Sequence, residues 1–347
     1  MKLPALLLSA LLLAAACDTA DTADTATAPD TATAPDSDSD SDTVSVSDTV
    51  SVSDTVSVSD SVSDSAAAPD TAPDSATAPD TAWGPNNPPQ PIGGDRPVTP
   101  VLPDAYTPDT AWPLVIVLHG YTASGGVQDL YFGTSERGRE LGFITLAPNG
   151  LVDSKGNHYW NGGPVCCDFD HTGVDDVAYI TGLIDEASTL WHVDPKRVYL
   201  IGHSNGAFMA HRMACDAPGR ITAIAALAGV SLTSLASCEA GPPVSILQMH
   251  GTLDDSVPYQ GTPYSPGAEA TVQLRVASNH CSPTAVVGAP RDYDDSVPGA
   301  ETLPQRWDGC DAGTTVELWQ MNGTVHLPGF NDTWRDEVLD WLLARTR

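Results

Sequence analysis

The chain has few basic residues. Lysine and arginine together number 15 in 347 residues, against 45 aspartates and glutamates, which gives a formal net charge of −30. A nucleic-acid-binding protein needs a basic surface to neutralise phosphates. The composition therefore argues against nucleic acid as a partner.

Aromatic residues are missing from the first 82 positions. Residues 18–80 contain fifteen aspartates without a single lysine, arginine or glutamate, and three tandem copies of Asp-Thr-Val-Ser-Val-Ser span 42–59. Such a segment cannot bury enough apolar surface to offset the entropy lost on folding. We therefore expect residues 17–94 to be a disordered, extended acidic linker and residues 95–347 to form one folded domain.

The N-terminal apolar run is too short to span a membrane. Met1-Lys2 supplies a positive start, a leucine-rich core follows, and three alanines precede Cys17. This order is typical of a secretory signal peptide over residues 1–16. The position of Cys17 resembles a bacterial lipoprotein box, in which the cysteine is lipidated and becomes the mature N-terminus. We expect export as a lipoprotein at the cell surface or in the periplasm, with only the lipid anchor in the membrane; without lipidation the protein would be extracellular.

Paired Cys-x-x-Cys motifs are also absent, which argues against a structural zinc site. An even number of cysteines follows Cys17, as expected for disulfides in an exported domain. Connectivity does not follow from sequence, although local order favours two pairs and leaves two adjacent cysteines that can join each other. These are Cys215 with Cys238, Cys281 with Cys310, and Cys166 beside Cys167.

Apolar segments alternate with helical patterns through the folded region. Residues 112–118 form a continuous apolar run, typical of a strand that is buried on both faces. Further strands are expected at 143–147, 198–201, 221–228, 244–249 and 315–320, with helices at 134–141, 175–191, 207–215 and 332–347. This alternation predicts an α/β fold with a mostly parallel sheet and helices on both faces. Active sites in such sheets lie at the carboxyl ends of the strands.

Gly202-His-Ser204-Asn-Gly206 stands between a predicted strand and a predicted helix. This is the Gly-x-Ser-x-Gly arrangement of a nucleophile elbow, where glycines make room for a sharp turn that exposes the serine. Serine needs a base to take its proton. We expect Ser204 to be a nucleophile if the chain supplies a base and an acid downstream, in that fold's order of Ser, Asp or Glu, and His.

His326 follows the last predicted strand and precedes the closing helix, so it is the expected base. Asp254 follows the strand at 244–249 and is the expected acid, with Asp255 as its rival. The other three downstream histidines are assigned structural or exposed roles, with His250 shaping a turn; they are His211, His250 and His280. The pair Asp175 and Asp176 lies at a helix start, where acids complement the helix dipole.

An oxyanion hole requires two backbone N–H groups. One is expected from Asn205, directly after the nucleophile, and the other from Tyr121, in the loop after the strand at 112–118. Neither role depends on the side chain, because the donors are peptide groups.

The ordered motifs together resemble the polyhydroxybutyrate depolymerase and feruloyl esterase group of α/β-hydrolases. The motifs are Leu118-His-Gly-Tyr-Thr-Ala-Ser-Gly-Gly126, Ala147-Pro-Asn-Gly150, Trp160-Asn161 with Cys166-Cys167, Val174-Asp-Asp-Val177, Gly202-His-Ser-Asn-Gly206, His250-Gly-Thr-x-Asp254-x-x-Val-Pro-Tyr259 and His326-x-Pro-Gly329. The resemblance implies an α/β-hydrolase fold with Ser204 as nucleophile, Asp254 as acid and His326 as base. The chain departs from the group on the substrate side, where Leu327 stands after the histidine and the group's tryptophan is absent.

The resemblance implies an exported serine esterase that forms an acyl-enzyme and needs no metal or organic cofactor. Its substrate would be an ester on plant polysaccharide, of the feruloyl or acetyl type, or a polyhydroxyalkanoate. Tyr121, Trp160 and Leu327 are expected to line the pocket. The alternatives are an acetylxylan esterase, a peptidase with the same triad, and a non-catalytic surface binding module on the same fold.

Overall fold

The structure, a computed structural model, describes residues 89–238 and 240–347. The predicted signal peptide, Cys17 and the linker up to residue 88 lie outside the described residues. Within the described part, no helix is both long and apolar enough to cross a membrane.

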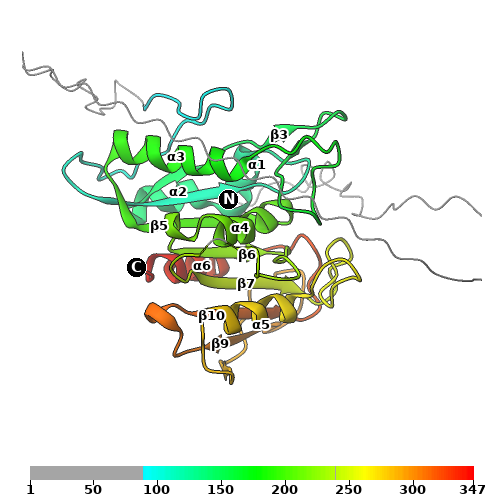
Figure 1. The fold of residues 1–347 in the computed structure, drawn as a ribbon. Coiled ribbons are helices and arrows are strands. Elements are labelled where there is room, and N and C mark those ends of the chain that lie inside the picture. Colours follow the sequence, from blue (N-terminus) through cyan, green and yellow to red (C-terminus); the bar gives the residue numbers. More distant parts are fainter. Residues whose placement is uncertain (1–88, 239) are drawn as a thin grey trace, which may run out of the picture. The chain divides into compact units, whose positions relative to one another are not determined.

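An eight-stranded sheet in the order β2-β1-β5-β6-β7-β10-β9-β8 forms the centre of the domain (Figure 1). Neighbouring strands from β2 to β10 are parallel, whereas β9 and β8 are antiparallel. The strands are β1 (Trp112–Leu118), β2 (Ile144–Leu146), β5 (Val193–His203), β6 (Ala223–Leu227), β7 (Ser245–Gly251), β8 (Val286–Val287), β9 (Thr302–Trp307) and β10 (Val316–Met321). A separate antiparallel pair joins β3 (Leu151–Val152) to β4 (His158–Tyr159).

Helices cover both faces of the sheet. One core cluster joins α3, α4 and α5 to one face, and a second joins α1 and α6 to the other. Strand β1 shows the alternation, because Leu114 and Ile116 belong to the first cluster while Val115 and Val117 belong to the second. The helices are α1 (Gly125–Phe132), α2 (Thr134–Leu141), α3 (Asp176–Trp191), α4 (Asn205–Asp216), α5 (Ala268–Ser278) and α6 (Asp332–Leu343).

The predicted fold class is therefore confirmed, with its mostly parallel sheet and two helical layers. Helix α2 and strand β1 have the predicted bounds. Helices α1 and α5 and the hairpin β8–β9 were not predicted.

The packed domain begins a few residues before the expected boundary at 94–95. Ile92 is only 4% exposed and pairs with Val98 in an antiparallel bridge. Its burial in the α3 side of the core overrides the loop-like composition around it. The last residues assigned to the linker thus belong to the folded part.

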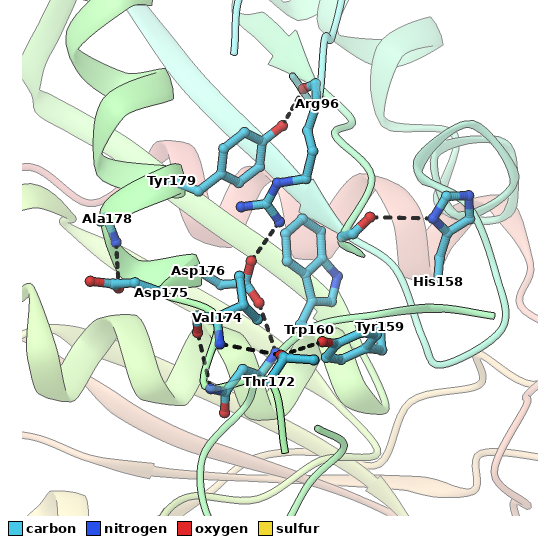
Figure 2. Close-up of polar contacts among 12 residues, drawn as sticks. Arg96, His158, Tyr159, Trp160, Thr172, Val174, Asp175, Asp176, Ala178 and Tyr179 are labelled. Carbon is cyan, nitrogen blue, oxygen red and sulfur yellow. Dashed lines mark hydrogen bonds and ion pairs between the residues drawn. The ribbon is translucent and has the colours of Figure 1, made fainter. Parts of the chain in front are cut away.

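Arg96 connects this N-terminal segment of the folded part to α3 (Figure 2). Its Nη1 donates to Asp176 Oδ1 at 2.6 Å, its guanidinium lies 3.6 Å from the centre of the Tyr179 ring, and Tyr179 Oη donates to the Arg96 carbonyl. Burial raises the pKa of Asp176. Asp175 caps the helix by accepting a hydrogen bond from Ala178 N, so both aspartates have the structural roles expected of a helix start.

Three disulfides occur in the described residues, in agreement with the predicted disulfide-containing domain. They join the two pairs favoured by local order, Cys215–Cys238 and Cys281–Cys310, and the adjacent Cys166 and Cys167. The last of these lies beside the elbow, where Asn205 Nδ2 donates to Cys166 Sγ at 3.5 Å.

Candidate active site

Ser204 occupies the single position between β5 and α4. Its backbone has φ 53° and ψ −121°, in the left-handed half of conformational space that a serine rarely adopts. A conformation of this kind costs about 1–3 kcal/mol and persists only where surrounding contacts enforce it. Here the Ser204 N–H donates to Leu227 O of β6 at 2.8 Å. The turn therefore has the strained geometry of a nucleophile elbow.

Two glycines allow this turn to pack. A Cβ on Gly206 would lie 2.5 Å from the Leu118 carbonyl carbon and 2.7 Å from His119 O. A Cβ on Gly202 would lie 2.5 Å from the Gly206 carbonyl carbon. Helix α4 thus starts against the end of β1 at a separation that only a hydrogen side chain permits.

Asp254 and His326 come together at the same edge of the sheet. His326 Nδ1 lies 2.8 Å from Asp254 Oδ2, and both side chains are largely buried. The other oxygen, Oδ1, accepts hydrogen bonds from Ser256 N at 3.0 Å and Val257 N at 2.8 Å. Asp255 is exposed, and its carboxylate accepts a hydrogen bond from Ser256 Oγ. The geometry therefore favours Asp254 over Asp255 as the partner of His326.

The surroundings keep Asp254 ionised. Burial by itself would raise the pKa of this carboxyl, but hydrogen bonds from His250 and His326 more than offset burial, and the pKa lies well below its ordinary value of 3.8. An ionised acid beside Nδ1 can hold the imidazole in the tautomer with a free Nε2 and stabilise the imidazolium.

Contacts from several elements fix the loop that carries His326. His203 Nε2 lies 2.9 Å from the His326 carbonyl oxygen, and the two rings are 4.9 Å apart. Tyr131 Oη donates to Pro328 O, and Asp294 Oδ1 accepts from Gly329 N. Burial lowers the pKa of His203 to about 3, so this ring is neutral and can donate to the carbonyl. Sequence reasoning missed His203, Tyr131 and Asp294, since no local motif signals contacts between residues that lie from 35 to 197 positions apart.

The loop after β1 passes directly beside Ser204. A Cβ on Gly120 would lie 3.4 Å from Ser204 Cβ. His119 locks the loop, because its Nδ1 donates to Gly120 O at 2.8 Å while its Nε2 accepts from Gly150 N at 2.9 Å. Burial lowers the pKa of His119 to about 4, which keeps the ring neutral. These contacts show that His119 holds the shape of the loop.

The two backbone N–H groups expected in the oxyanion hole belong to Tyr121 in this loop and to Asn205 directly after Ser204. Within the described residues, neither Tyr121 N nor Asn205 N makes a hydrogen bond to another backbone or side-chain group. The Asn205 side chain is fully engaged, with Oδ1 accepting from Trp160 N at 2.7 Å and Nδ2 donating to Trp160 O at 2.8 Å. Asn205 therefore joins the elbow to the segment after β4.

The three predicted pocket residues have different surroundings. Leu327 is 36% exposed beside His326. Tyr121 is half-buried, its ring lies edge-on to Phe169, and its hydroxyl donates to Asp153 Oδ2. Trp160 is fully buried, with its ring 5.0 Å from His119 and 6.3 Å from Tyr179 (Figure 2). Trp160 supports the loop from inside the core, which places its ring behind the site instead of on an accessible wall.

The Ser204 hydroxyl makes no hydrogen bond to any described residue, the expected base His326 included. Such contacts often tighten only with substrate bound. No group of three or more histidine, cysteine, aspartate or glutamate side chains in the described part of the chain could hold a metal ion.

Comparison with known proteins identifies the fold. The family model described as phospholipase/carboxylesterase matches residues 107–265, which include Ser204 and Asp254. An acetyl xylan esterase structure from Aspergillus awamori superposes with a TM-score of 0.54 at 15% identity, over 73% of this chain and 98% of that one. The fold is that of an α/β-hydrolase.

The curated relatives confirm the group that the motifs resemble. Feruloyl esterase B of Piromyces equi is 28% identical over 238 residues, which is 67% of this chain and 43% of that protein. Poly(3-hydroxybutyrate) depolymerase of Ralstonia pickettii is 32% identical over 134 residues, or 35% of this chain and 26% of that protein. This chain thus covers less than half the length of both relatives.

Proposed function

We propose that the protein is a serine esterase that hydrolyses carboxylic esters through Ser204, Asp254 and His326. The observation that carries the proposal is the contact between His326 Nδ1 and Asp254 Oδ2, at the edge of the sheet where Ser204 stands on its strained turn. The family match and the esterases among the relatives support the same reaction class.

The reaction follows from these positions. Ser204 Oγ attacks the ester carbonyl carbon while His326 Nε2 takes the hydroxyl proton, and the same proton passes to the departing alkoxide. The acyl group is then bound to Ser204. Water attacks that carbonyl with His326 again as base, which releases the acid and restores the serine. The N–H groups of Tyr121 and Asn205 would stabilise the oxyanion, each contributing about 3 kcal/mol to the transition state.

The nucleophile is tested by hydrolysis of p-nitrophenyl butyrate. Ser204→Ala should lower kcat on the order of 10⁵-fold while the protein remains folded. Full activity in that variant would refute the assignment. A complete lack of turnover in the unmodified protein would favour the non-catalytic binding module.

For the substrate we propose an ester of the feruloyl or hydroxybutyrate type, because relatives of both names match the chain. Parallel assays of methyl ferulate, hydroxybutyrate oligomers and acetylated xylan would separate these from the acetylxylan alternative. A peptide anilide with the same acyl group would test the peptidase alternative.

We further propose that the protein is exported and anchored through lipid on Cys17. The three disulfides support export, since such bonds persist in oxidising compartments. Detergent-phase partitioning of the full chain should disappear in Cys17→Ser. Partitioning that persists in the variant would contradict lipidation.

A further inference from the structure

His250 lies at the end of β7, four residues before Asp254, and its side chain is fully buried. Its Nε2 lies 2.7 Å from Val257 O and 3.3 Å from Asp254 Oδ2. Oδ2 of Asp254 is therefore the same oxygen that lies next to His326 Nδ1. Two imidazoles share one carboxylate oxygen, while backbone amides hold the other.

The neighbours of His250 fix its tautomer. Gln248 Nε2 donates to Gly229 O at 2.8 Å and lies 3.3 Å from His250 Nδ1. An amide nitrogen can only donate, so Nδ1 accepts and the ring proton resides on Nε2. That proton points at Val257 O and Asp254 Oδ2, both of which can only accept.

The polar contacts extend from His250 through Gln248 to α4, the helix that follows Ser204. His211 Nε2, on α4, lies 2.8 Å from Gln248 Oε1. Arg275 of α5 donates from Nη2 to His211 O at 3.0 Å and from Nη1 to Ala214 O at 3.4 Å. Gln248, His211 and Arg275 are each no more than 4% exposed. A cation at the last carbonyls of a helix also complements its dipole.

We propose that His250 is a positioning residue of the triad, which orients Asp254 toward His326 and ties the acid through Gln248 and His211 to the helix behind Ser204. The proposal rests on the esterase function proposed above. A turn-shaping role alone would need only the bond to Val257 O. The shared carboxylate oxygen and the fixed tautomer indicate the further role.

The charge state of Asp254 agrees with this assignment. Burial alone would raise the pKa of Asp254, and hydrogen bonding by His250 is the largest of the effects that lower it. The other titratable groups around the pair are His203 from β5, His211 from α4, Tyr259 in the loop after β7, and Arg275 from α5. Burial lowers the pKa of His203 and of His211 to about 3, so neither ring carries a charge at neutral pH.

A matched pair of variants tests the proposal. In His250→Gln the amide nitrogen can reach the place of Nε2 and keep the donor toward Asp254, whereas His250→Asn can replace only Nδ1. We expect His250→Asn to lower kcat about 10- to 100-fold, with KM changed less than about threefold, since partners of this kind typically contribute that much. The acid limb of the kcat/KM profile should move by roughly half a pH unit or more, and His250→Gln should recover most of both effects.

His280→Asn serves as the control, because this histidine is exposed and its ring contacts exposed Asp311 instead of a residue of the triad. It should leave kcat and the pH profile unchanged. A His250→Asn protein with lowered thermal stability but unaltered kcat and acid limb would show that His250 only shapes the turn, and would overturn the proposal.

A second measurement needs no variant. Nitrogen-15 NMR of the unmodified protein should show the Nε2–H tautomer of His250, and its signal should shift when a phosphonate modifies Ser204. The Nδ1–H tautomer would overturn the proposal. Phosphonate labelling and the loss of activity in Ser204→Ala do not depend on His250, so failure of the esterase assignment is distinguishable from failure of the positioning role.

Discussion

Replacing Gly206 by alanine is the sharpest test of the elbow. The added methyl would lie 2.5 Å from the Leu118 carbonyl carbon and 2.7 Å from His119 O, where ordinary contacts begin at 3.4 Å. Both partners are backbone atoms, at the end of β1 and in the loop that follows it, so they cannot move as a flexible side chain would. The start of α4 must shift by at least roughly 1 Å, which is the difference between the 2.5 Å separation and an ordinary contact of 3.4 Å, because Leu118 O lies closer still.

That displacement has two calculable consequences. Overpacking of a rigid site costs about 1–3 kcal/mol, and for a domain of this size each kcal/mol lowers Tm by about 2–4 °C. A misplacement of about 1 Å at a catalytic group reduces the rate about 10²-fold. Because Ser204 and Asn205 N both move with the helix start, we expect the loss in kcat and little change in KM.

The assay is p-nitrophenyl butyrate hydrolysis, with thermal unfolding followed in parallel. Gly182→Ala is the matched control, since a Cβ at this position in α3 meets nothing within 4 Å. Removing a glycine from a helix interior should stabilise that variant by about 1 kcal/mol and leave kcat unchanged. A folded Gly206→Ala protein with undiminished kcat would show that the close approach of α4 to β1 does not set the position of the nucleophile.

Three further predictions concern the acid, a disulfide and a buried histidine. Asp254→Asn should lower kcat about 10⁴-fold by allowing the wrong imidazole tautomer, whereas Asp255→Asn should stay within about twofold of the unmodified enzyme in the same ester assay. Replacing Cys281 and Cys310 by serine opens a loop with a sequence separation of 29 residues and should cost about 3–4 kcal/mol, measured by urea unfolding under oxidising conditions. Burial lowers the pKa of His211 to about 3, below its ordinary 6.5, so the unfolded chain takes up the proton first and stability falls as pH drops below 6.5. By about pH 4.5 this loss is roughly 2–3 kcal/mol, and His211→Gln should show a correspondingly smaller difference in urea midpoint between about pH 7.5 and 4.5.

The central fold could be predicted because its signals are local. The apolar run at 112–118 has no polar interruption, as a strand covered on both faces requires, and β1 has those bounds. This local signal fails where a helix or strand contains residues that are unusual for it. Helix α1 opens on two glycines, and α5 turns Arg275 inward, which breaks its apolar face. Strand β9 contains Pro304, and proline usually argues against a strand.

The expected triad residues could be chosen because chain order and strand ends restrict the candidates. Asp254 and Asp255 could not be separated by that argument, since adjacent residues follow the same strand. Their difference lies in burial and direction: Asp254 turns inward to His326 and two backbone amides, and Asp255 faces solvent.

The layer behind the triad depends on contacts that no sequence spacing encodes. His203, the variable residue of the elbow motif, donates to the backbone of His326, 123 positions away. His250, expected only to shape a turn, shares an oxygen of Asp254 with the base. Both rings are buried and donate in the tautomers that their partners require, which is the arrangement expected of residues that position the triad. The order of the motifs therefore predicts which residues react, whereas the three-dimensional contacts decide how accurately those residues are held. We propose that the elbow and its supporting histidines supply accuracy on the scale of about 1 Å.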